Sequence, residues 1–83
     1  MSALILFRSL TYAQRGLYVL SRSGIPGKLI KAPRDLTDRG CAYGVLISDN
    51  RLAQAKEELA AQHAEYSSVW LRNALGEYHE AEP

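Results

Sequence analysis

Cys41 is the side chain best suited to covalent chemistry, and it is the only cysteine among the 83 residues. A cysteine thiolate is a strong nucleophile whose reactivity depends on its pKa and its exposure. A single cysteine can form neither an internal disulfide nor a four-cysteine zinc site. We therefore expect a free, reduced thiol, which either reacts or packs as a small apolar residue at the start of a strand.

The elements that must position this thiol follow from the apolar pattern of the chain. A continuous apolar run is typical of a strand buried on both faces, whereas apolar residues at helical spacing mark one side of a helix. The expected elements are a buried strand at 3–7, a helix at 12–22, an edge strand at 28–32, a buried strand at 43–48, a helix at 51–63 and a short strand at 69–71.

This β-α-β-β-α-β order predicts an α+β, ferredoxin-like domain over residues 1–72, with a four-stranded antiparallel sheet and both helices on one face. The spacing of Thr11 and Gln14 predicts a capping box at the start of the first helix. The inward side of the second helix is expected to carry Leu52, Ala55 and Leu59, with Ala60 at its margin. Residues 73–83 are acidic and poor in apolar residues, which indicates a frayed tail.

In this topology the first strand and the strand before the loop at 33–42 run in the same direction. The end of the first strand, the start of the first helix and the loop that carries Cys41 therefore lie at one end of the sheet. The positive end of a helix and nearby arginines favour a thiolate, so we expect the pKa of Cys41 to lie below its ordinary value. The candidate binding residues around it are Ser9, Thr11, Arg34 and Arg39.

The charges are balanced in number but not in position. The chain has ten basic and nine acidic residues. Seven of the basic residues lie in the segment from Arg8 to Arg39, which contains only two acidic residues. Binding of nucleic acid would need a strongly basic domain with aromatic residues on one face, so we do not expect it. The positive region suits a small anion, an acidic protein partner or plain solvated surface.

Several other functions have weak support in the sequence. The longest apolar stretch, residues 3–7, is too short to cross a membrane, and no basic region of a secretory signal precedes it, so a cytoplasmic protein is expected. His63 and His79 have no partner at ligand spacing, so neither a metal nor a cofactor is expected. A Cys–His pair between Cys41 and His63 stays open as an alternative.

The three tyrosines Tyr12, Tyr18 and Tyr43 are interpreted as half-buried packing residues rather than as a platform on which bases stack.

Short motifs connect the chain to a known family. They are FRSLT at 7–11, GIP at 24–26 and LIKAPR at 29–34, followed by the single cysteine and a second helix. In these residues the chain resembles the selenium/sulfur carrier-like family of small single-cysteine domains, over about residues 4 to 71. The most telling part is the Pro-Arg pair that precedes the loop with the cysteine.

The resemblance implies that Cys41 is the residue that carries sulfur or selenium, whereas Ser9, Thr11 and Arg34 match motif positions without an assigned role. The chain departs from the family at one point. The family's cysteine is typically followed by glycine, but here Gly40 precedes the cysteine and Ala42 follows it.

The leading hypothesis is thus a carrier protein, an accessory factor rather than a stand-alone enzyme, that holds a persulfide-type adduct on Cys41. A cysteine desulfurase would be a suitable donor, and a second enzyme would accept the sulfur or selenium. The alternative is a small binding or regulatory module for an anion or a protein partner, in which Cys41 is structural. A homodimer is also open, because a small sheet has edges and a face that can pair.

Overall fold

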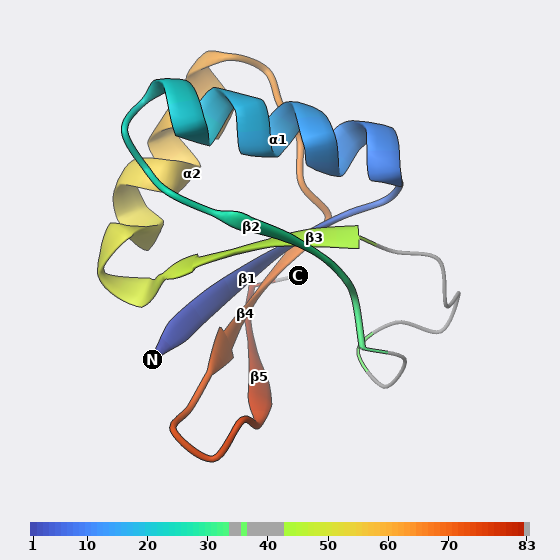
Figure 1. The fold of residues 1–83 in the computed structure, drawn as a ribbon, viewed down its shortest axis with the longest axis vertical. Helices are drawn as coiled ribbons and strands as arrows, with labels where there is room; N and C mark the ends of the chain where they lie inside the picture. Colours follow the sequence, from blue (N-terminus) through green and yellow to red (C-terminus); the bar gives the residue numbers. More distant parts are fainter. Residues whose placement is uncertain (34–35, 37–42, 83) are drawn as a thin grey trace.

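Five strands and two α-helices make up the part of the chain that the structure describes. This computed structural model describes residues 1–33, 36 and 43–82. The elements are β1 (Ser2–Phe7), α1 (Leu10–Arg22), β2 (Lys28–Lys31), β3 (Tyr43–Ser48), the short 3-10 helix η2 (Asp49–Arg51), α2 (Leu52–Ala61), β4 (Ser68–Arg72) and β5 (Tyr78–Glu82). The strands form one antiparallel sheet in the order β2-β3-β1-β4-β5, and both helices cover the same face of it (Figure 1).

The predicted α+β class, with two helices on one face of an antiparallel sheet, is confirmed. In the described part of the chain, no helix combines the length and apolar character needed to cross a membrane.

Strand β1 lies in the middle of the sheet, between β3 and β4. Successive side chains of a strand point to opposite faces, so its continuous apolar sequence must be covered on both sides. Ala3, Ile5 and Phe7 pack under the helices, while Leu4 and Leu6 are buried on the opposite face. The prediction of a strand that is buried on both faces is confirmed.

The prediction of four strands followed by a frayed tail is wrong, because β5 pairs with β4 at the edge of the sheet. A tight turn joins the two strands. Asn73 Oδ1 accepts hydrogen bonds from the backbone N–H groups of Leu75 at 2.9 Å and Glu77 at 3.0 Å, and Gly76 adopts a left-handed φ of 83°. An edge strand needs few apolar residues, since only part of it is covered.

Helix α1 begins after Ser9, not after the predicted cap Thr11. Ser9 has an extended backbone, and its Oγ accepts a hydrogen bond from the Tyr12 N–H at 3.4 Å. The helix ends at Arg22, and the φ of 80° at Gly24 lets the Ile25 N–H reach the Leu20 carbonyl at 2.9 Å. This is the hydrogen-bonding pattern of a glycine-terminated helix, and it buries Ile25 beneath the helix end.

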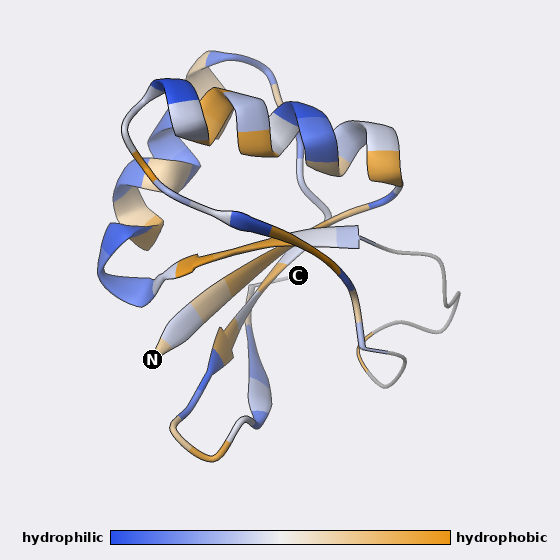
Figure 2. Cartoon of the chain, in the orientation of Figure 1, coloured by the Kyte–Doolittle hydropathy of each residue, from blue (hydrophilic) through white to orange (hydrophobic). Residues whose placement is uncertain are grey.

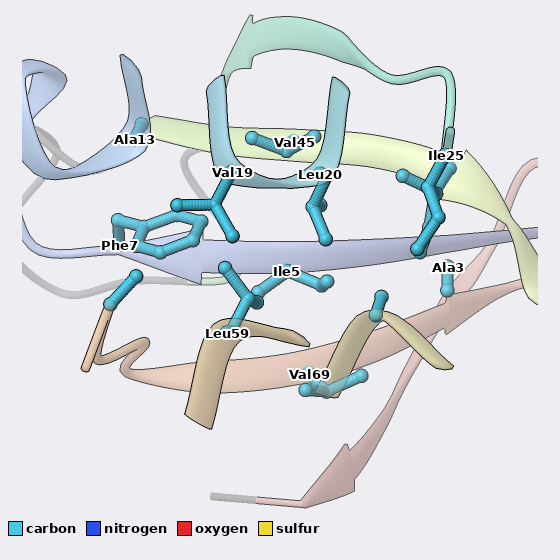
Figure 3. Close-up of a cluster of buried hydrophobic side chains, with 13 residues drawn as sticks. Ala3, Ile5, Phe7, Ala13, Val19, Leu20, Ile25, Val45, Leu59 and Val69 are labelled. Atoms are coloured by element: carbon cyan, nitrogen blue, oxygen red, sulfur yellow. The ribbon is translucent and has the colours of Figure 1, made fainter. Parts of the chain in front are cut away.

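The main core lies between the helices and the sheet (Figure 3). Leu59 points from α2 toward Ile5 on β1, and Val19 and Leu20 reach the same core from α1. Leu59 and Ala55 are fully buried as predicted, and Leu52 is half-buried, but Ala60 is exposed. The inward face of α2 is therefore narrower than its sequence suggested.

Gly16 sets the distance between α1 and β1. A Cβ atom built on Gly16 would overlap Cζ of Phe7 and lie 2.9 Å from Cε2, and the ring is only 1% exposed, so it cannot swing away. We expect Gly16→Ala to lower the free energy of unfolding by about 1 to 3 kcal/mol, although alanine is the better helix former by about 1 kcal/mol. Urea denaturation measures the change.

The matched control is the double variant Phe7→Leu with Gly16→Ala. Leucine removes the ring atoms that the new methyl group meets, so the double variant should lose less stability than the sum of the two single variants. A stabilising Gly16→Ala, or strict additivity, would contradict the close contact between ring and helix.

Candidate functional site

Three chain segments meet at one end of the sheet. Phe7, the last residue of β1, and Lys31, the last residue of β2, both lie opposite Tyr43, the first residue of β3. Both strands are antiparallel to β3 and therefore run in the same direction. This confirms one premise of the predicted site: the end of β1, the start of α1 and the two ends of the loop at 33–42 share one end of the sheet.

The start of α1 presents backbone donors at this end. Ser9 is half-buried and caps the helix, so its carbonyl accepts from the Ala13 N–H at 3.0 Å and its hydroxyl accepts from the Tyr12 N–H. The N–H groups of Leu10 and Thr11 have no acceptor within the helix, and the first turn holds no acidic residue. Such a terminus favours a negative charge nearby.

Arg8 adds a full positive charge beside this helix start. Its guanidinium carbon lies 4.4 Å from the centre of the Tyr12 ring, and its Nη2 donates a hydrogen bond to the Tyr12 hydroxyl at 3.1 Å. This pair was missed in the sequence, where the four-residue spacing of arginine and tyrosine was the available signal. Arg8 and Tyr12 therefore belong to the candidate site.

The predicted site residues divide into two groups. The structure describes Ser9 and Thr11, which lie at the start of α1, with Thr11 exposed. Arg34, Arg39 and Cys41 lie outside the described residues. Their place next to the helix start stays a prediction.

Leu36 is described, and it lies on the face of the sheet that carries no helix. We call this the outer sheet face, which is formed by Leu4, Leu6, Ile30, Ala32, Leu46, Trp70 and Tyr78. Leu36 is half-buried against this group, and its N–H donates to the Pro33 carbonyl at 3.1 Å. The chain beyond β2 thus contributes at least one side chain to the cover of the outer sheet face.

Two of the three tyrosines differ from their interpretation as packing residues. Tyr43 is half-buried against the main core, as expected. Tyr12 and Tyr18 are 39% and 60% exposed, so both lie on the solvent side of α1. The helical spacing of the apolar residues did not separate these tyrosines from the buried positions.

The position of His63 has a structural explanation. It follows α2 with a left-handed φ of 56°, which lets the Ala64 N–H reach the Leu59 carbonyl at 2.9 Å. The helix therefore ends at Ala61, two residues before the predicted end, and His63 is exposed. A pairing of His63 with Cys41 stays a prediction.

Comparison with known proteins gives one finding. No match was found among curated proteins or among solved structures. The model of the family described as "Putative Se/S carrier protein-like" matches residues 2–71, which is most of the chain and includes every residue of the candidate site. The chain belongs to the Putative Se/S carrier protein-like family.

Proposed function

We propose that this chain is a cytoplasmic sulfur or selenium carrier that holds the transferred atom on Cys41. The family match over residues 2–71 carries the proposal, because it covers the only cysteine of the chain. The donor would be a persulfide-bearing enzyme such as a cysteine desulfurase, and the acceptor would be a second enzyme. No resident cofactor takes part in this scheme.

The proposed transfer is a thiol–persulfide exchange. The Cys41 thiolate attacks the outer sulfur of the donor's Cys–S–SH group, a new S–S bond forms, and the donor's S–S bond breaks. The donor cysteine leaves as a thiolate, and Cys41 becomes Cys41–S–SH. Charge, protons and electrons balance without an added oxidant or reductant, and the same exchange applies to a terminal selenium atom.

The geometry around the loop ends supports this assignment. Cys41 is two residues before Tyr43, so the covalent chain keeps their Cα atoms within about 7 Å of each other. Tyr43 pairs with Phe7, and α1 begins three residues after Phe7. We propose that the start of α1, with Ser9 and Thr11, stabilises the anion and that Arg34 or Arg39 lowers the pKa of the thiol or helps the donor to bind.

We also infer that the fold is a ferredoxin-like unit to which β5 has been added. The first four strands lie in the order β2-β3-β1-β4, with β3 and β1 in the middle and a helix after β1 and after β3. That order supports the inference.

The thiol's reactivity tests the proposal. We expect Cys41 in the wild type to be alkylated with a pH midpoint below that of an unstructured cysteine peptide, because the helix start and an arginine favour the thiolate. Arg34→Ala or Arg39→Ala should raise the midpoint, and added salt should shrink the difference if that arginine is exposed.

Arg72→Ala is the matched control, since it removes an exposed arginine from β4 instead of from the loop. It should leave the midpoint unchanged. A wild-type midpoint at or above that of the free peptide would instead favour a structural cysteine in a binding module.

A further inference from the structure

The solvent side of α1 carries a continuous row of arginine and tyrosine. Arg15 and Arg22 lie seven residues apart, so they share one side of the helix, and Tyr12 and Tyr18 lie three residues from Arg15 on either side. Arg8 extends the row at the start of the helix through its contact with Tyr12. We call these five residues the α1 basic face; all five are exposed.

The arginines of the α1 basic face are held in place before any partner binds. Arg8 stacks on Tyr12, and Arg22 Nη1 donates to the Tyr18 hydroxyl at 3.0 Å. That hydrogen bond raises the pKa of Arg22 above its ordinary value. Arg15 Nη2 donates to the Gln62 carbonyl at 2.9 Å. Side chains that are already ordered lose less entropy when they bind.

The segment of the chain that carries this face, residues 1–33, contains no acidic residue. Residues 1–33 contain five basic residues and no acidic ones, whereas residues 43–82 contain three basic residues and seven acidic ones. Among the described acids, Glu58 of α2 contacts the end of α1, where it accepts a hydrogen bond from Ser23 at 2.9 Å. The described segment that contains α1, residues 1–33, is therefore positively charged, whereas residues 43–82 are negatively charged.

A hollow adjoins the row where α1 meets the end of α2. It has a volume of about 270 Å³ and is lined by Tyr18, Val19, Arg22, Ser23 and Gln62. Its walls combine an aromatic ring, a guanidinium and polar groups. An acidic or amide side chain of a partner would find both a charge and a hydrogen-bonding site there.

We infer that the α1 basic face is a docking surface for an acidic segment of a partner protein. Arginine and tyrosine are the residue types enriched at the centres of protein interfaces, and complementary charge speeds and orients the encounter. The row is about 20 Å long, which suits one helix or strand of a partner. The opposite sign of residues 43–82 would repel an extended nucleic acid.

The inference rests on the proposed function for the identity of the partner, which would be the donor or the acceptor of sulfur. The α1 basic face begins at the end of the sheet where the loop at 33–42 leaves and rejoins it. A partner that lies along α1 therefore has its bound segment directed toward the end of the sheet at which the loop with Cys41 begins and ends.

Binding of a synthetic Glu-rich peptide to the ¹⁵N-labelled protein tests the inference. We expect chemical-shift changes confined to α1 and its flanks, and weaker binding at higher salt. The double variant Arg8→Glu with Arg22→Glu should bind about tenfold more weakly, and Arg8→Gln with Arg22→Gln should fall between. Arg15 is left unchanged because it also caps α2.

Arg72→Glu is the matched control. The guanidinium carbon of Arg72 on β4 lies 5.9 Å from the centre of the Tyr78 ring on β5, much as that of Arg22 lies 5.7 Å from the centre of the Tyr18 ring. This variant should bind like the wild type. The inference would be overturned if the peptide did not bind, if the shifts lay outside α1 or depended on protein self-association, or if Arg72→Glu lost as much binding as the double variant. Tighter binding of a single-stranded dT oligonucleotide would also overturn it. Cys41→Ser should bind the peptide normally, so a failure of sulfur loading is distinguishable from a failure of docking.

Discussion

Leu59→Ala is expected to lower the free energy of unfolding by about 2 to 5 kcal/mol. Leu59 is fully buried and lies between α2 and the centre of the sheet (Figure 3), so its truncation leaves a cavity that the surrounding side chains fill only in part. A small domain has a total stability of about 5 kcal/mol at the low end, and the variant would approach unfolding. Urea denaturation followed by circular dichroism measures the loss.

Leu75→Ala provides the same chemical change at an exposed position. Leu75 lies in the turn between β4 and β5 and is 83% exposed, so its truncation should alter stability by less than about 0.5 kcal/mol. Equal losses at the two positions, or a loss below about 1 kcal/mol for Leu59→Ala, would mean that the inward face of α2 is assigned wrongly.

The sequence was informative wherever burial is complete. An unbroken apolar run such as residues 3–7 favours a central strand, because a strand covered on both faces buries all of its side chains and the run is too short for a buried helix. The inward leucine of α2 was also predicted, since Leu59 follows Ala55 at helical spacing. Ala60 was misplaced because its small side chain gives a weak signal at the margin of a helix face.

Partly covered elements were harder to predict. Strand β5 contains Tyr78 and His79 among charged residues, so composition indicated a tail, and the turn at Asn73 and Gly76 carried the real signal. Thr11 was predicted as the cap because Gln14 completed a capping box in the sequence. The hydrogen bond from the Tyr12 N–H to Ser9 shows which residue has the extended backbone that a cap requires.

The candidate site was predicted in its topology but not in its electrostatics. The shared end of β1 and β2 followed from the order of elements. The exposed pairs of Arg8 with Tyr12 and of Arg22 with Tyr18 did not, because the aromatic rings were assigned to packing. Figure 2 shows that hydrophilic and hydrophobic residues alternate along α1. An average of hydropathy over the whole helix therefore does not reveal the row of arginine and tyrosine on its solvent side.

Sulfur loading of Cys41 tests the central claim most directly. The purified protein is incubated with a cysteine desulfurase and cysteine, and its intact mass is measured without reductant, with Cys41→Ser treated in the same way. We expect the wild type to gain the mass of one sulfur atom, to lose it again when a reductant is added, and the serine variant to gain nothing while keeping its melting temperature. An unmodified wild type under conditions in which the desulfurase itself carries a persulfide, or an equal gain in Cys41→Ser, would contradict the claim that Cys41 is the carrier residue.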